Sequence, residues 1–153
     1  MSNMSDKEWE AHLWLARMWD KDNEIESYEK RKDDILSQLS GIGKYDSEFI
    51  PAQTGENSVE TKNIEYSQLC AKIEQVIRDI SHMNARSLEV ISQVENVKTR
   101  SMLYDRFINR MTWNQIGNKY HYAKAQPYRY VGKGLDEARR YITEEEIREV
   151  CYV

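Results

Sequence analysis

Two long stretches of the chain repeat apolar residues every three or four positions, the spacing of one face of an α-helix. In the second stretch apolar residues also recur at seven-residue intervals, at Leu69, Val76, Met83, Val90 and Val97. Only 2 Pro and 6 Gly occur in 153 residues, so little interrupts these patterns. We therefore expect an all-α protein whose long helices bury their apolar stripes by pairing.

The first stretch begins at a capping box, Ser5-Asp6-Lys7-Glu8, and its apolar spacing continues to Ile42. Ser40-Gly41 and Gly43 should stop this helix, and we expect a connecting loop over residues 40–62. The second helix should cover residues 63–97. Together they predict a long, coiled-coil-like antiparallel hairpin as a first domain, residues 1–97. The second stripe is wider than one partner helix needs, which favours a homo-oligomer, dimer or higher.

Residues 98–153 follow a different pattern. An apolar helix ends near Arg110, and a second capping box at Thr112-Trp113-Asn114-Gln115 opens a short helix that ends near Tyr120. Gly117 would let a crossing helix approach closely. The next helix places Pro127, Val131 and Leu135 four residues apart, on one face. This arrangement predicts a C-terminal helix-turn-helix domain, with Phe107, Trp113, Ile116 and Leu135 in its core.

Charge is divided unevenly along the chain. From Lys98 to Tyr141 there are ten Lys or Arg and three Asp or Glu, a local charge of +7, so the other residues carry −11 to give the total of −4. Salt screens charges that lie further apart than about 8–10 Å, so attraction to phosphate depends on the local face. The basic segment therefore indicates double-stranded DNA as a partner, although the whole chain is acidic.

Candidates for DNA contact lie outside the apolar face of the last of these helices, at Lys124, Ala125, Gln126, Arg129 and Lys133. Arg129 and Gln126 are the best candidates for reading bases, because Arg suits guanine and Gln suits adenine in the major groove. Lys124, Lys133 and the earlier Arg110 suit phosphate contact. Each could instead be a solvated surface residue. Tyr128 and Tyr130 could pack on the first helix or reach a phosphate, and the sequence does not decide.

The segment Leu103–Leu135 resembles small regulators of phages and prophages that carry a helix-turn-helix like region four of sigma factors. These include ArpU-like and RinA-like late regulators and a related streptococcal phage group of unknown function. The similarity lies at Leu103, Arg106-Phe107, Thr112-Trp113, Ile116, Tyr120, Tyr122, Tyr128-Arg129, Gly132 and Leu135. It implies a sequence-specific transcription regulator of late or packaging genes, acting on promoter DNA in the cytoplasm of a bacterial host.

Two residues depart from the pattern of these regulators. Ala123 stands where a Ser is usual, which removes a side-chain acceptor that would cap the next helix. Pro127 replaces an apolar residue whose amide can donate. If the helix begins at Lys124, Pro127 lies in its first turn and costs little; if it begins at Tyr122, Pro127 would kink it.

Other functions remain open. A small-terminase-like subunit for DNA packaging also combines a helix-turn-helix with oligomerising helices. A protein-binding adaptor that has lost DNA binding would fit Pro127 and the acidic total. Trp9, Trp14 and Trp19 make the start of the first helix apolar on most sides, which fits either a buried core or a surface for host RNA polymerase or another subunit.

Catalysis, cofactors and membranes find little support. The 3 His are scattered, the 2 Cys (Cys70 and Cys151) lie far apart, and there is no glycine-rich phosphate loop. We expect neither an enzyme nor a metal or cofactor site. The sequence has no signal peptide and no apolar run of about 18 residues, so we expect a cytoplasmic protein.

Overall fold

The computed structural model describes residues 4–44, 59–123 and 125–152. Within these ranges all regular secondary structure is helical, so the all-α prediction is confirmed. The chain forms two compact units. Trp19–Ser81 is the two-helix unit, and Met1–Met18 together with His82–Val153 is the module. In the described part of the chain, no helix combines the length and apolar character needed to cross a membrane.

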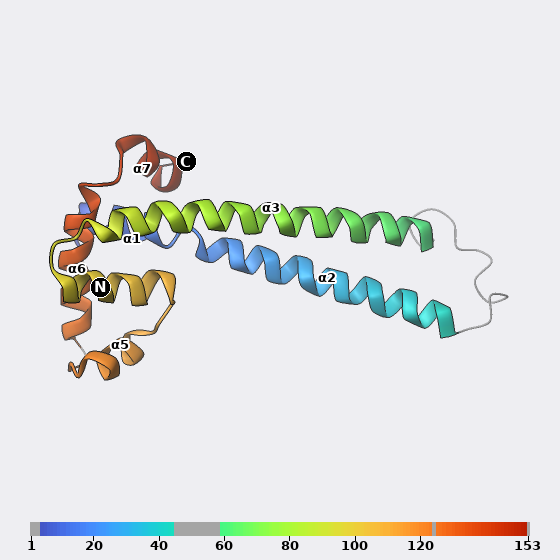
Figure 1. Cartoon of the computed structure of the whole chain (residues 1–153), viewed down its shortest axis with the longest axis horizontal. Helices are drawn as coiled ribbons and strands as arrows, with labels where there is room; N and C mark the ends of the chain where they lie inside the picture. The colour runs from blue at the N-terminus through green and yellow to red at the C-terminus, as the bar shows by residue number, and fades with distance from the viewer. Residues whose placement is uncertain (1–3, 45–58, 124, 153) are drawn as a thin grey trace. The chain divides into compact units, whose positions relative to one another are not determined.

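The two-helix unit consists of α2 (Trp19–Lys44) and the first part of α3 (Val59–Ser92), which run side by side in opposite directions (Figure 1). Arg31 donates to both carboxylate oxygens of Glu65, at 2.7 and 2.9 Å, and joins the helices. Exposed ion pairs of this kind contribute at most about 1 kcal/mol. The buried apolar side chains therefore contribute most to this pairing: Ile35, Leu69, Ile73 and Val76.

The ends of these two helices differ from the prediction. α2 continues through Gly41 and Gly43 to Lys44, and α3 begins at Val59, so both extend into the expected loop 40–62. Residues 45–58 of that loop lie outside the described residues. A glycine costs a helix about 1 kcal/mol relative to alanine, which weakens a helix without forbidding it. A prediction from the two glycines alone therefore ends α2 earlier in the sequence than the structure does.

The first predicted helix is interrupted, because α1 (Asp6–Leu15) ends before α2 begins. Arg17 lies in the break. Its guanidinium donates to the carbonyl of Trp14 at 2.7 Å, and on α3 to Ser87 Oγ at 3.0 Å and to the carbonyl of Met83 at 3.1 Å. Burial lowers the pKa of Arg17 to about 10, so it stays charged at neutral pH. These tertiary hydrogen bonds hold the chain in a turn where the local pattern favours a helix.

The second predicted helix is also shorter than expected. α3 ends at Ser92, and Asn96 caps a new helix, α4 (Val97–Leu103), by accepting from the Thr99 amide at 3.0 Å. Val97, the last member of the seven-residue repeat, is 65% exposed. The prediction of one helix to residue 97 is therefore wrong. α4 continues directly into a π-helical turn, η3 (Tyr104–Ile108).

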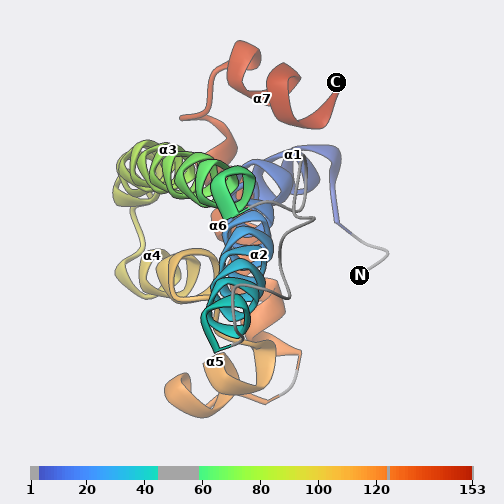
Figure 2. The ribbon, with the colours of Figure 1, turned by 90° about the vertical axis from the view of Figure 1, so that its right-hand side faces the viewer.

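The module is built around α6 (Gln126–Arg139), which packs against α1, α4 and α5 (Trp113–Tyr120) (Figure 2). α7 (Glu144–Cys151) packs on α1. Arg139 on α6 donates to Glu10 of α1 at 2.9 Å and to Glu144 of α7 at 2.8 Å. The division differs from the boundary expected at residue 97, because α1 and the end of α3 pack with the C-terminal helices.

Candidate nucleic-acid interface

α5 is fixed at both of its ends. At its start, the Thr112 hydroxyl accepts from the Gln115 amide at 3.2 Å, and the Gln115 side chain accepts from the Thr112 amide at 2.8 Å. This is the capping box predicted from the sequence. At its end, His121 adopts left-handed backbone angles, with φ 59° and ψ 45°, and the Tyr122 amide donates to the Gly117 carbonyl at 2.9 Å. The chain therefore turns sharply between α5 and α6.

Gly117 is the point where this turn and α6 approach α5. A Cβ atom at Gly117 would lie 3.3 Å from the carbonyl oxygen of Tyr122 and 3.7 Å from Cγ of Pro127. α6 begins at Gln126, so Pro127 lies in the first turn, where helix amides have no partner within the helix and a missing one costs little. The Gln126 side chain accepts from the Ala123 amide at 3.3 Å. The Ala123 amide thus has a partner, but Ala125, the N-cap of α6, makes no side-chain capping hydrogen bond.

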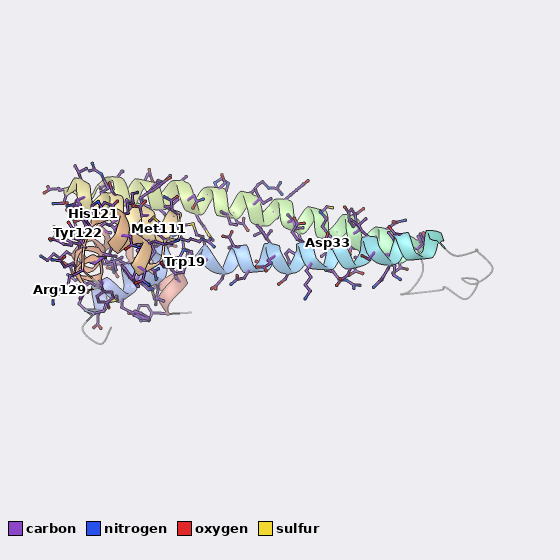
Figure 3. All side chains as sticks on the ribbon, turned by 90° about the horizontal axis from the view of Figure 1, so that it is seen from below. Trp19, Asp33, Met111, His121, Tyr122 and Arg129 are labelled. Carbon is purple, nitrogen blue, oxygen red and sulfur yellow. The ribbon has the colours of Figure 1, made fainter. Side chains whose placement is uncertain are left out.

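α6 has two distinct faces over its first turns. Pro127, Val131 and Leu135 are buried, as the sequence predicted. Gln126, Arg129 and Lys133 are exposed and follow the i, i+3, i+7 spacing of one helix face. Arg129 lies at the outer edge of the module (Figure 3). Ala125, just before α6, is exposed too, whereas Lys124 lies outside the described residues.

A groove of about 620 Å³ follows this exposed face. Its lining includes Gln126, Arg129, Tyr130 and Lys133 of this region, and Glu8 of α1 also lines it. Glu8 belongs to the capping box of α1, in which its carboxylate accepts from the Ser5 amide at 3.4 Å. Sequence reasoning did not place this carboxylate beside the candidate DNA contacts, because α1 and α6 are far apart along the chain.

The structure sorts the cations of the basic segment into two groups. The first group is engaged inside the module: Arg100 with the Val94 carbonyl, Arg106 with the Met111 carbonyl, Arg110 with the Met18 carbonyl, Lys119 with Asp105, and Arg139 with Glu10 and Glu144. The second group, Lys98, Arg129, Lys133 and Arg140, has no ion-pair partner among the described residues. The charge available for a ligand is therefore smaller than the sequence count, and it includes two residues of the exposed α6 face.

Asp105 explains why Lys119 belongs to the first group. Its side chain is buried and accepts from Tyr120 Oη at 2.6 Å, Lys119 Nζ at 2.8 Å and Asn109 Nδ2 at 3.2 Å. Burial opposes the charge on Asp105, but these three hydrogen bonds outweigh it and leave the pKa of Asp105 below its usual value. The carboxylate ties α5 to η3. The sequence alone shows an acidic residue within a basic segment, but not the hydrogen bonds that this residue makes.

Two tyrosines on α6 take different roles. Tyr128 packs edge-on against Trp113, with ring centroids 5.4 Å apart, and its hydroxyl is buried without a hydrogen-bond partner among the described residues. Tyr130 stacks on Tyr122 at 5.1 Å and lines the groove. Of the predicted core residues, Phe107, Ile116 and Leu135 are buried. Trp113 is half-buried, under the guanidinium of Arg106.

No family model matches the chain, and no curated protein or solved structure matches it either. The chemistry of α6 and its neighbours is therefore the basis on which a function can be proposed.

Proposed function

We propose that this chain is a sequence-specific regulator of transcription that binds double-stranded DNA, with α5 and α6 acting as a helix-turn-helix and α6 as the recognition helix. One observation carries the proposal. Gln126, Arg129 and Lys133 share an exposed face of α6, the two cations have no carboxylate partner among the described residues, and the opposite face is buried. A helix with one face in the core and one polar, basic face suits the major groove.

Each side chain on that face has a defined role in the proposed complex. The Arg129 guanidinium can donate two hydrogen bonds to a guanine, and the Gln126 amide can pair with an adenine. Gln126 must first release the Ala123 amide, to which it is bound in the free protein. Lys133, two turns along α6 from Gln126, would contact a phosphate and contribute affinity without sequence preference. Arg110 and Lys124 do not carry the proposal, since Arg110 is engaged with Met18 and Lys124 is outside the described residues.

The proposal that this chain regulates phage genes comes from the resemblance of Leu103–Leu135 to late regulators. It identifies the genes to test, which are those for phage late functions or packaging. Contact with host RNA polymerase is part of the same proposal and needs its own test. Pull-down of purified polymerase by the full chain on a bound promoter fragment, compared with the chain alone, would detect it.

DNA binding is tested by selection with the full chain from a pool of random duplexes, followed by fluorescence anisotropy on the enriched sequence. We expect one preferred sequence, bound at least about 10³-fold more tightly than unrelated duplex. The logarithm of the binding constant should fall linearly with the logarithm of salt concentration, by about 0.9 for each phosphate contacted. A pool without enrichment, together with binding that does not depend on salt, would overturn the proposal and favour a protein-binding adaptor.

We further propose that the two-helix unit joins copies of the chain. Ile64 and Ile77 on α3 are each 53% exposed, although Leu69, Ile73 and Val76 between them are buried against α2. Ile77 widens the apolar stripe of α3 beyond the buried Ile73 and Val76, and a stripe wider than one partner helix needs suits burial against a second copy. Sedimentation analysis should give a dimer or a larger assembly, and Ile77→Lys should weaken it while Asn63→Lys, at an exposed polar position, should not. A ring of many subunits would favour a packaging role.

A further inference from the structure

We propose that Lys98, Tyr122, Tyr130 and Lys133, which we call the tyrosine row, form a second DNA-contacting surface that binds phosphates of one strand beside the α6 groove. This inference rests on the proposed function, because it extends the same DNA-binding face. It adds residues from α4 and from the turn after α5 to a contact that the sequence predicted at Arg110, on α6 and at the two residues before α6.

The row brings together side chains from three segments of the module. The Lys98 ammonium lies over the Tyr122 ring, 4.8 Å from its centroid. Tyr122 and Tyr130 stack with centroids 5.1 Å apart and ring planes 18° from parallel. The Lys133 ammonium lies 5.9 Å from the centroid of Tyr130. The result is a continuous series of cation, two rings and cation.

The row is continuous with the groove along α6. Tyr130 and Lys133 belong to both, since each also lines the groove. A duplex that places its major groove on Gln126 and Arg129 would therefore bring the phosphates at the edge of that groove toward the row. Lys98 and Lys133 are both exposed, and neither has an ion-pair partner among the described residues.

The chemistry of the row favours phosphates over bases. One face of each tyrosine ring is covered by the other ring, and a lysine ammonium lies over each of them. Little open ring surface is left for an unpaired base to stack on, which is what proteins that bind single strands provide. The ammonium groups and the tyrosine hydroxyls are donors of the kind that hold phosphate oxygens. A hydrogen bond with Tyr122 raises the pKa of Lys98, so this ammonium stays fully charged at neutral pH.

The test compares Lys98→Gln and Tyr122→Phe with the matched variant Lys30→Gln, an exposed lysine on α2 in the two-helix unit. Binding of the full chain is measured by anisotropy on the selected duplex and on an unrelated duplex, over a range of salt concentrations. Lys98→Gln should weaken both complexes by a similar factor and reduce the salt slope by about 1. Tyr122→Phe keeps the stack but lacks the hydroxyl, and it should weaken both complexes without changing the preference between them. Lys30→Gln should change neither.

The outcomes separate this inference from the function on which it rests. If the wild-type chain prefers its selected duplex while both row variants bind like wild type, the row does not contact phosphate and the inference is wrong, but DNA recognition by α6 stands. If the wild-type chain binds neither duplex, the proposed function itself fails. A preference for single-stranded DNA that Tyr122→Phe leaves intact would also overturn the inference, because it would assign the rings to base stacking. Thermal melting of each variant shows that the fold is retained.

Discussion

Gly134 on α6 lies against Thr99 on α4 with no room for a side chain between them. A Cβ atom at Gly134 would be 2.5 Å from Cγ2 of Thr99 and 3.0 Å from Cδ1 of Leu103, both of which are buried. Gly134→Ala should therefore destabilise the protein by about 1–3 kcal/mol through overpacking, although alanine is the better helix former. Urea unfolding followed by circular dichroism measures the change.

Gly132 is the matched control, because it lies on the same helix and a Cβ there would meet only the Glu8 carboxylate, at 3.6 Å, an ordinary contact distance. Gly132→Ala should leave stability unchanged or raise it by up to about 1 kcal/mol. Equal losses from the two substitutions would show that the close approach of α6 to α4 is not what the glycine permits.

Glu146 should make the stability of the module sensitive to acid. The two hydrogen bonds from Arg86, at 2.9 Å each, are the main cause that lowers the pKa of Glu146 to about 2. Because this pKa lies below the usual 4.5 of the unfolded chain, the stabilisation is fully present above about pH 4.5 and is lost as the pH falls toward 2. Glu146→Gln should lower the melting temperature at pH 7, and its difference from wild type should shrink below pH 4.5.

The glutamine in this variant can still accept from the Thr143 amide, so the capping box of α7 is kept, while the charge and one of the two acceptors for Arg86 are removed. Glu145→Gln changes an exposed carboxylate in the same turn and should have little effect at any pH. A Glu146→Gln difference that stays constant from pH 7 to pH 3 would contradict the ion pair as its source.

Arg129 should determine the preference for one base. Arg129→Ala should weaken binding to the selected duplex by about 1–3 kcal/mol and relax the preference at a single position of it. Arg129→Lys should recover part of the affinity, since it restores the charge, but not the preference, since lysine lacks the two-pronged donor geometry. Anisotropy on the selected duplex and its single-base variants measures both. Arg78→Ala, at an exposed arginine of the two-helix unit, is the matched control, and a loss as large as that for Arg129→Ala would contradict the assignment.

The Glu8 carboxylate should weaken the binding of DNA by the wild-type chain, so its removal should tighten binding. Its carboxylate lines the same groove as Arg129 and Lys133 and would repel nearby phosphates. Glu8→Gln keeps the capping box of α1 and should tighten binding about 1.5- to 5-fold at low salt, as expected for removal of one exposed charge interaction. Asp6→Asn removes the same charge from an exposed position of the same turn that does not line the groove. Equal gains from both would mean that only total charge matters.

Local signals predicted the starts of α1 and α5. The capping boxes at Ser5 and Thr112 are both present, because each depends on residues three apart that meet wherever a helix begins. The buried positions Val131 and Leu135 followed from spacing alone. These features need no knowledge of the rest of the chain.

The breaks in the helices could not be predicted in the same way. The turn at Arg17 depends on partners about seventy positions later, at Met83 and Ser87. Apolar spacing continues across it, so the periodicity indicates one helix. Val97 shows the same effect, because its place in the repeat is regular and the start of α4 nevertheless leaves it exposed.

The candidate site was predictable only where it lies on one helix. Gln126, Arg129 and Lys133 share a face that follows from α-helical geometry. Glu8 and Lys98 reach the same region from α1 and α4, and their positions depend on how those helices pack on α6. A charge count likewise cannot show that Lys119 is neutralised by a buried Asp105.

α6 carries both an exposed face and enclosed positions, and these two sets of residues should be under different evolutionary pressure. Gln126, Arg129 and Lys133 are exposed, whereas Gly134, Leu135 and Arg139 are buried and held by neighbouring helices. Changes at the first three positions can alter the ligand preference of the protein at little cost to folding. Related chains should therefore vary at these three positions while keeping the later turns of the helix, and libraries for retargeting should be restricted to the same three.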